Sequence, residues 1–304
     1  MLHEVFYWIF NMSITATVSG IVVLLLKSIK RIPRRIALYF WLVPFIRLVL
    51  PVGMNSPYSF MTLLSEFSIK TVTVYLHDDK FEFSMTNSIG AAESYFPVTY
   101  KINVVENIFH IASVFWLIVL VIAIAAFLII YITSVNEVKK TTHIKGNIYV
   151  SERIKTPAVY GILKPKIILP VSYNESYSGL IIMHEEMHIR RKDNFWRILA
   201  FMIALVYWFN PFVWLFLKEF LSDVELSCDE KLVTIIGEER KKEYAQLLLR
   251  ERENTNLLSS AFGGAKIRTR IENILSYKKI TIVSSIVFML LFTVISLVLL
   301  TNAD

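Results

Sequence analysis

The sequence predicts a mainly α-helical membrane protein that also carries an α+β domain on the cytoplasmic side of the bilayer. Mean hydropathy is +0.53. Only 19% of the 304 residues are charged, whereas a soluble domain usually has about a quarter. Long apolar runs recur along the chain, and the polar region between them contains strand and helix patterns. One cysteine, Cys228, excludes an internal disulfide.

About four apolar runs are predicted to cross the bilayer. A spanning helix needs about 20 apolar residues. The run 36–52 is short and contains Pro44 and Arg47; we expect Arg47 to snorkel to the outer interface from the end of its helix. The predicted transmembrane helices are 5–26, 36–52 and 109–132 in a membrane domain 1–134, and a final one in 280–304.

Charge predicts the orientation, because loops rich in Lys and Arg stay in the cytoplasm. The connection 27–35 has five cations and no acid, whereas the loop 53–107 has three lysines against six acidic residues. The domain 135–279 has 23 Lys and Arg against 17 Asp and Glu. We expect both termini and the loop 53–107 outside the cell membrane and 135–279 inside. Contact with anionic lipid then accounts for the net charge of +7, and no nucleic acid is expected to bind.

Two regions show strand patterns. Ile69–Leu76 in the outer loop alternates between apolar and polar residues, which predicts a strand, either in a plain connector or in a loop that touches a ligand. In the polar domain, 147–151 and 158–169 are predicted strands, and 157–170 is a hairpin with its turn near Leu163–Pro165. Prolines confine such strands to a sheet edge. That edge could pair with an extended substrate or be purely structural.

The strongest chemical signal is the run His184-Glu185-Glu186-Met187-His188. It follows the H-E-x-x-H pattern, within a helix expected through Leu180–Arg191. The i, i+4 spacing places both imidazoles on one helical face, close enough to share a metal ion. The intervening Glu185 can take a proton from a water at that ion. The pattern therefore predicts Zn²⁺ with His184 and His188 as ligands and Glu185 as catalytic base.

A zinc site of this kind needs a third protein ligand. Glu225 and Asp229 are again i, i+4 and face one way from a second helix. We expect Glu225 to bind the metal and Asp229 to accept the outer N–H of a ligand histidine, which fixes the imidazole tautomer. Asp193 is awkwardly spaced for the same helical face. Glu230 and Asp223 rank below Glu225, and Cys228 is expected on the back of the Glu225 helix as a small buried side chain.

The position of Glu225 constrains the apolar run 198–217. If that run crossed the bilayer, Glu225 would emerge roughly 30 Å from the histidines. Asn210-Pro211 is a turn signal inside the run. We therefore expect a re-entrant or interfacial helical hairpin that enters the membrane and returns, with the metal site at the cytoplasmic surface.

These motifs in combination resemble the BlaR/MecR-type membrane metallopeptidases, which are antibiotic-sensing signal transducers and their relatives. The resemblance rests on His184-Glu185-x-x-His188, the segment Gly161–Pro170, Asn210-Pro211 and Glu225-Leu-Ser-Cys-Asp229-Glu230. It implies a gluzincin-like zinc metalloprotease domain on the cytoplasmic side with His184, His188 and Glu225 as ligands. It also implies cleavage of a cytosolic protein such as a winged-helix repressor. In the best-known members a penicillin-binding sensor domain follows the last helix, and this sequence contains none; it is either the transducer portion of a longer protein or a relative that lacks the sensor.

Two further expectations remain open. The family suggests self-cleavage near Ser260, Ala261 and Phe262, because the segment Ser259–Gly264 has small residues and two glycines that allow an extended, accessible conformation; a simple flexible linker is equally compatible with it. A homodimer is also compatible with the sequence. The alternative function is a non-catalytic membrane receptor or scaffold whose metal domain binds partners, and such a protein would signal normally without Glu185.

Overall fold

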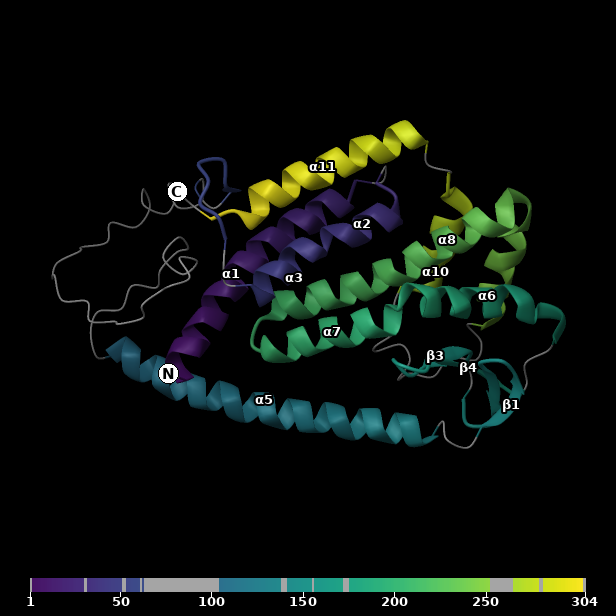
Figure 1. Ribbon diagram of the computed structural model, residues 1–304, viewed down its shortest axis with the longest axis horizontal. Coiled ribbons are helices and arrows are strands. Elements are labelled where there is room, and N and C mark those ends of the chain that lie inside the picture. Colours follow the sequence, from purple (N-terminus) through teal and green to yellow (C-terminus); the bar gives the residue numbers. More distant parts are fainter. Residues whose placement is uncertain are drawn as a thin grey trace.

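The protein is an elongated helical bundle with a small sheet at one end (Figure 1). The computed structural model describes residues 2–29, 32–50, 53–60, 62, 104–137, 141–154, 156–171, 175–251, 265–278 and 281–302. The predicted strand 69–76 and the predicted cleavage residues Ser260, Ala261 and Phe262 lie outside these ranges. In the membrane part the elements are α1 (Leu2–Lys27), α2 (Arg34–Phe40), α3 (Leu42–Val49), α5 (Val104–Glu137) and α11 (Ile282–Leu300).

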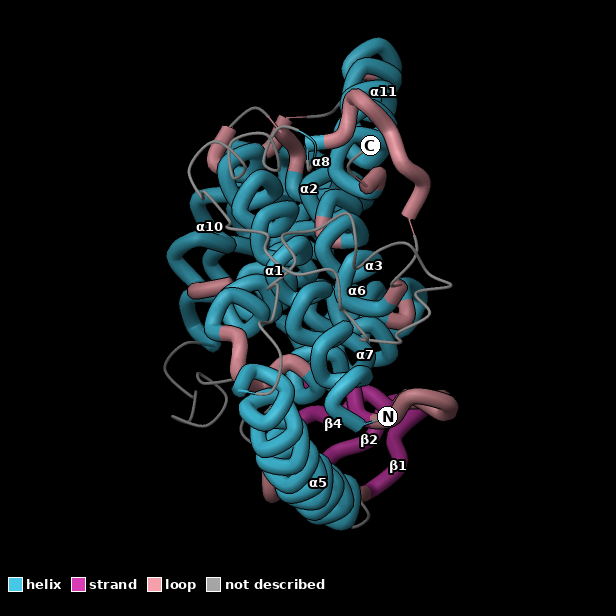
Figure 2. Tube along the Cα trace, turned by 90° about the vertical axis from the view of Figure 1, so that its left-hand side faces the viewer, coloured by secondary structure: helices cyan, strands magenta, loops and turns pink. Residues whose placement is uncertain are grey.

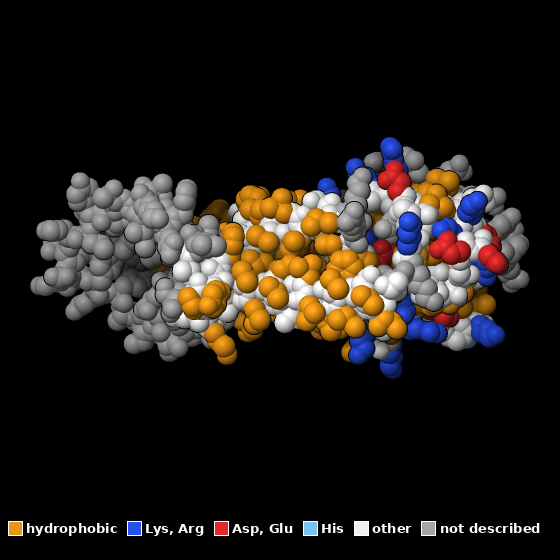
Figure 3. Space-filling model, turned by 90° about the horizontal axis from the view of Figure 1, so that it is seen from above, with side chains coloured by type: hydrophobic (Ala, Val, Ile, Leu, Met, Phe, Trp, Pro, Cys, Tyr) orange, Lys and Arg blue, Asp and Glu red, His pale blue; other side chains and the backbone are white. Residues whose placement is uncertain are grey.

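The remaining elements build the polar end and the segment that enters the bundle. The strands are β1 (Thr142–Lys145), β2 (Ile148–Ser151), β3 (Ala158–Tyr160) and β4 (Lys166–Pro170), and the helices are α6 (Glu175–Arg191), α7 (Asp193–Val206), α8 (Pro211–Glu251) and α10 (Ile267–Ser276). Charged side chains gather at this end, and apolar side chains cover the middle of the molecule (Figure 3). This division matches a bundle that sits in lipid and a domain that sits in water.

Three described helices are long and apolar enough to span a membrane: α1, α5 and α11. Large apolar side chains along α5 and α11 are exposed, which only a lipid environment makes favourable. The predicted span 36–52 consists instead of the two short helices α2 and α3. Pro44 has no N–H and its ring crowds the carbonyl of Phe40, so the helix is interrupted at Trp41. The fourth transmembrane helix therefore stays a prediction.

Helices α7 and α8 form an antiparallel hairpin within the bundle (Figure 1). The chain turns at Tyr207–Asn210, where the Asn210 N–H donates to the Tyr207 carbonyl at 2.9 Å. Asn210 Oδ1 accepts the Phe212 N–H and caps α8, while its amide donates to Thr17 on α1. Pro211 at the first helical position suits this start. The run 198–217 thus folds back, as the sequence analysis expects, and α8 returns towards α6.

The sheet has the strand order β1-β2-β4-β3 and lies beside the helical body near α6 and α7 (Figure 2). β1 and β2 are antiparallel, and β2 and β4 are parallel with Ile148 opposite Ile167. β3 and β4 form the predicted antiparallel hairpin, with Val159 opposite Ile167. β3 is an edge strand, as the prolines predict, whereas β4 pairs with both β2 and β3, so the prediction of an edge position is wrong for β4 even though this strand ends at Pro170.

Arg47 and the cations of the connection 27–35 have other partners than the sequence predicts. Arg47 is buried and does not snorkel: its Nε donates to the Leu299 carbonyl at 2.9 Å and its Nη1 to Asn302 Oδ1 at 2.9 Å. It therefore satisfies the terminal carbonyls of α11 and ties α11 to α3. Cations of the 27–35 connection face α8 as well as any lipid, because Lys27 Nζ contacts Asp223 Oδ2 at 2.9 Å.

Candidate metal centre

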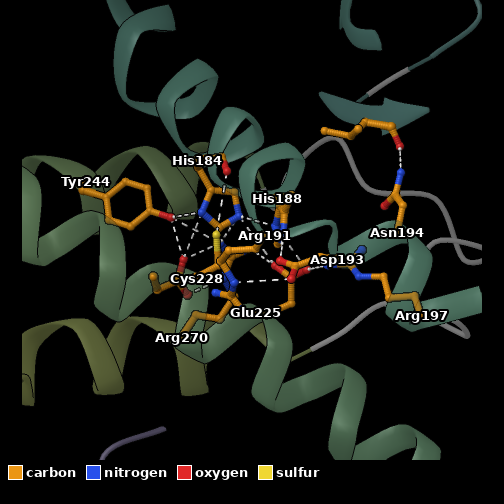
Figure 4. A network of polar contacts seen from close by, with 12 residues as sticks. His184, His188, Arg191, Asp193, Asn194, Arg197, Glu225, Cys228, Tyr244 and Arg270 are labelled. Atoms are coloured by element: carbon orange, nitrogen blue, oxygen red, sulfur yellow. Dashed lines mark hydrogen bonds and ion pairs between the residues drawn. The ribbon is translucent and has the colours of Figure 1, made fainter. Parts of the chain in front are cut away.

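Helix α6 brings the two histidines of the H-E-x-x-H run together. Both imidazoles are buried, with 5% of each residue exposed, and their Nε2 atoms lie 3.0 Å apart (Figure 4). One turn of helix separates His184 from His188, so the rings project from the same face. Two imidazole nitrogens that converge in a buried place are ready to share one cation.

The outer nitrogen of His188 contacts an acid just beyond the end of α6. His188 Nδ1 and Asp193 Oδ2 lie 2.6 Å apart. Lys192 between them has φ +56 and ψ 37, a left-handed conformation that ends α6 and redirects the chain. This turn removes the spacing problem that made Asp193 awkward on a continuous helix. Asp193 is the hydrogen-bond partner of His188 Nδ1, which orients the ring so that Nε2 faces His184.

The outer nitrogen of His184 meets a tyrosine that the sequence analysis did not identify. The Tyr244 hydroxyl lies 2.9 Å from His184 Nδ1 and donates to Asp229 Oδ1 at 2.6 Å. Asp229 Oδ1 is 3.4 Å from the same ring nitrogen. Asp229, predicted as the partner of one ligand histidine, therefore lies beside the outer nitrogen of His184, with Tyr244 alongside. Gly237, at φ +82 and ψ 171, kinks α8 between the two residues and permits this return.

Glu225 on α8 lies against both imidazoles. Its Oε2 is 3.6 Å from His184 Nε2, and its Oε1 is 3.6 Å from His188 Nε2. Two arginines hold the same carboxylate: Arg197 donates to Oε1, and Arg270 Nη1 is 3.4 Å from Oε2. Glu225 thus lies within a few ångströms of both ring nitrogens, the spatial condition on which the sequence analysis depends.

Cys228 lies on the side of α8 that faces the imidazoles, so the expected position on the back of the helix is wrong. It is fully buried, as expected, and its thiol donates to the His184 carbonyl at 3.7 Å. Donor atoms of His184, His188 and Cys228 all lie within 4.8 Å of one another. The residue is one turn from Glu225 on the same helix, and this spacing is the signal that could have placed it in the site.

Electrostatics at the site favour positive charge between the ligand atoms. Burial lowers the pKa of His188, but the neighbouring Cys228, Glu225 and Asp193 raise this pKa by more, and the net result is a pKa of about 9. Burial raises the pKa of Glu225, but His188 and Arg197 bring it well below its usual value. The Cys228 thiol is buried, which raises its pKa, yet the neighbouring imidazoles lower it to about 7. A divalent cation would supply the charge that these groups favour.

The donor set fits a zinc ion. Two imidazoles and a carboxylate converge from two helices, and each imidazole has a hydrogen-bond partner at its outer nitrogen. Three such donors that leave a fourth position open are typical of catalytic zinc. Their assignment as ligands remains a prediction. Glu185 is half-buried on α6 next to His184, and its role as catalytic base also remains a prediction.

The lower-ranked acids Asp223 and Glu230 face away from the imidazoles. Asp223 Oδ2 accepts the indole N–H of Trp41 at 2.8 Å. Glu230 accepts the backbone N–H groups of Arg34 and Arg35 at 3.0 and 3.1 Å and so caps the start of α2. Both carboxylates hold the connection between α1 and α2 against α8.

Fold and site together define the class. The chain is a mainly helical membrane protein whose polar end combines a small sheet, an H-E-x-x-H helix and a converging carboxylate, an arrangement typical of metallopeptidases. Residues 7–274 match the family described as BlaR1 peptidase M56. The chain therefore belongs to the BlaR1 peptidase M56 family.

Curated proteins similar to this chain include two regulatory proteins named BlaR1 and a methicillin resistance protein named mecR1. The chain is 28% identical over 138 residues to the regulatory protein BlaR1 of Bacillus licheniformis, which covers 42% of this chain and 23% of the relative. It is 26% identical over 199 residues to the regulatory protein BlaR1 of Staphylococcus aureus, covering 56% and 34%. The methicillin resistance mecR1 protein of Staphylococcus aureus is 27% identical over 104 residues, covering 33% and 18%. The chain thus spans about a third or less of these relatives' length.

Proposed function

We propose that this protein is a membrane-embedded zinc metalloprotease that acts in transmembrane signalling by cleaving a cytosolic protein such as a transcriptional repressor. The observation that carries the proposal is the convergence of His184, His188 and Glu225 within 3.6 Å of one another, with acids and a tyrosine behind the imidazoles. Membership of a peptidase family supports the same reading. Self-cleavage near Ser260–Phe262 belongs to the proposal as a second reaction.

Zinc held by His184, His188 and Glu225 would supply Lewis acidity and lower the pKa of a water molecule to about 7. Glu185 would accept a proton from the water that attacks the scissile carbonyl and would return it to the leaving nitrogen. Asp193 and Tyr244 keep the imidazole Nδ1 protons in place, so the Nε2 lone pairs point inward. The buried position of the imidazoles excludes competing water and strengthens these interactions.

The edge strand β3 is the proposed place for an extended substrate. It stands at the edge of the sheet, beyond β4, and contacts helix α6. The Asn194 amide, one residue after Asp193, donates to the Val159 and Gly161 carbonyls of this edge at 3.0 and 3.3 Å. Asn194 thus fixes β3 relative to the histidines. A substrate that adds a strand here would compete with this amide for the two carbonyls.

The proposed orientation places the metal centre beneath the inner leaflet. α8 binds the cation-rich 27–35 connection through Glu219, Asp223 and Glu230, so the site and that connection share one end of the bundle. Since positively charged connections stay inside, this end is proposed as cytoplasmic. The N-terminus and the end of α11 lie towards the opposite end (Figure 1) and are proposed as extracellular.

The test compares two adjacent glutamates in the full chain. Glu185→Gln should abolish cleavage of a cytosolic substrate and of the chain itself, while zinc content stays at the parent level. Glu186→Gln is the matched control, because 42% of the Glu186 side chain is exposed and it contacts Arg190 at 3.8 Å one turn along the helix; it should cleave normally. Parent-rate cleavage by Glu185→Gln contradicts the enzyme assignment. Normal signalling without any cleavage favours the receptor or scaffold alternative.

A further inference from the structure

Arg270 on α10 reaches into the candidate metal centre from a distant part of the chain. Its Nε donates to Asp229 Oδ2 at 2.8 Å and its Nη2 to Asp229 Oδ1 at 2.7 Å, a bidentate pair. The same Nη2 lies 3.3 Å from the Tyr244 hydroxyl and 3.2 Å from His184 Nε2, the nitrogen that faces His188. Only 13% of the Arg270 side chain is exposed.

This guanidinium is unusual beside a cation site. Arginine has no lone pair to give to a metal and stays protonated in proteins. A positive charge next to a divalent ion repels it, and the repulsion is stronger in a buried place. Arg270 lies 3.4 Å from Glu225 Oε2 as well as against Asp229, so it holds one predicted ligand and the acid behind another. The contacts of Arg270 with Glu225 and Asp229 therefore favour metal binding, whereas the positive charge of Arg270 opposes it.

α10 is joined to both the protease end and a membrane helix. Only residues 277–281 separate it from α11. The Tyr277 hydroxyl, at the end of α10, contacts Thr234 on α8 at 3.0 Å and accepts a hydrogen bond from Arg35 at 2.9 Å. At its other end α11 is held by Arg47. Arg270 is thus fixed in the site only while α10 is docked on α8.

We propose that Arg270 is a positioning residue of the metal centre, which makes the ligand geometry depend on the docking of α10 and hence on the connection to membrane helix α11. The inference rests on the proposed function and names a means by which the membrane part controls it. A displacement of α11 that pulls α10 from α8 withdraws Arg270 and leaves Asp229 and Glu225 without their shared partner.

The experiment measures metal binding rather than cleavage. The full chain is purified in detergent, stripped of metal, and titrated with Zn²⁺ against a chromophoric chelator and with Co²⁺ by its visible absorption. Arg270→Gln should lower Zn²⁺ affinity about 10–100-fold, the usual effect of removing a group that orients a ligand, and change the Co²⁺ spectrum. Arg268→Gln on the same helix is the matched control, because Arg268 is 88% exposed and pairs only with Glu272; it should match the parent.

Whether Arg270→Gln weakens or tightens Zn²⁺ binding decides the proposal. If Arg270 were only a nearby cation, its removal would tighten Zn²⁺ binding; equal or tighter binding by Arg270→Gln overturns the inference. Arg270→Lys keeps the charge without the two-pronged geometry and should recover only part of the affinity. Full recovery of both affinity and spectrum by lysine would contradict positioning by the guanidinium.

A milder variant covers the case in which Arg270→Gln does not fold. Tyr277→Phe removes one hydroxyl from the end of α10, away from the metal centre. It should lower Zn²⁺ affinity in the same direction by a smaller factor, and an unchanged affinity contradicts control through α10. His184→Ala separates the two proposals. If His184→Ala binds Zn²⁺ like the parent, the proposed function fails. If His184→Ala loses Zn²⁺ binding while Arg270→Gln binds like the parent, only the inference about Arg270 fails.

Discussion

The two faces of α8 carry carboxylates that are both largely buried, with 0% of the Asp223 and 12% of the Glu225 side chain exposed, but that have different surroundings. On one face Asp223 meets Lys27 and Trp41 at 2.9 and 2.8 Å, and its charge is satisfied by groups of fixed position. On the other face Glu225 lies 3.6 Å from the Nε2 atoms of both imidazoles. Burial of an acid is therefore a poor guide to a metal site, and convergence with two imidazoles is a better one.

The largest difference between the faces should appear when Glu225 is removed. Glu225→Ala deletes a predicted ligand, so its effect on Zn²⁺ affinity should exceed the about 10–100-fold expected for a supporting partner. Competition with a chelator measures the loss. Parent-like affinity in this variant would mean that Glu225 is not a ligand, and it would direct attention to the His184, His188 and Cys228 group.

Removal of Asp223 should affect folding and leave metal binding intact. The residue is fully buried, pairs with Lys27 and accepts the indole N–H of Trp41. Its removal leaves that buried N–H without an acceptor, which costs about 1–3 kcal/mol, while Lys27 keeps its contact with Glu219. Asp223→Ala should lower the thermal stability of the chain in detergent, while the folded fraction binds Zn²⁺ like the parent. A large loss of Zn²⁺ affinity in the folded fraction would mean that the two faces are not independent.

Asp193→Asn tests the support behind His188. The amide keeps the size of the side chain but removes the negative charge 2.6 Å from Nδ1. Zn²⁺ affinity should fall about 10–100-fold, less than for Glu225→Ala. An affinity equal to that of the parent would show that the contact with His188 has no part in metal binding.

The smallest effect is expected at the rim of the first face. Glu219 pairs with Lys27 at 2.6 Å, but 32% of its side chain is exposed. Exposed pairs of this kind contribute about 1 kcal/mol or less. Glu219→Gln should therefore shift thermal stability only slightly and leave Zn²⁺ affinity unchanged. A loss as large as that of Asp223→Ala would assign the main anchoring role to Glu219.

Arg47, beside the end of α11, is a residue whose environment the sequence predicts wrongly. Arg47 at the end of an apolar run suggested an arginine that reaches the interface, because long cationic side chains usually do so. The structure buries it, since the carbonyls at the end of α11 offer it partners. That choice depends on a helix some 250 residues away, with contact to Asn302 separated by 255 positions, and no local pattern encodes it.

The sequence by itself determines the features that depend on short-range spacing. The i, i+4 histidines of α6, the i, i+4 acids of α8, the turn at Asn210-Pro211 and the hairpin of β3 and β4 can all be predicted, because helix and strand periodicity fixes which neighbours share a face. Only the tertiary structure decides that Tyr244 and Arg270 join them and that Cys228 faces inward. Those positions follow from the kink at Gly237 and from the docking of α10, which depend on packing between segments far apart in the chain.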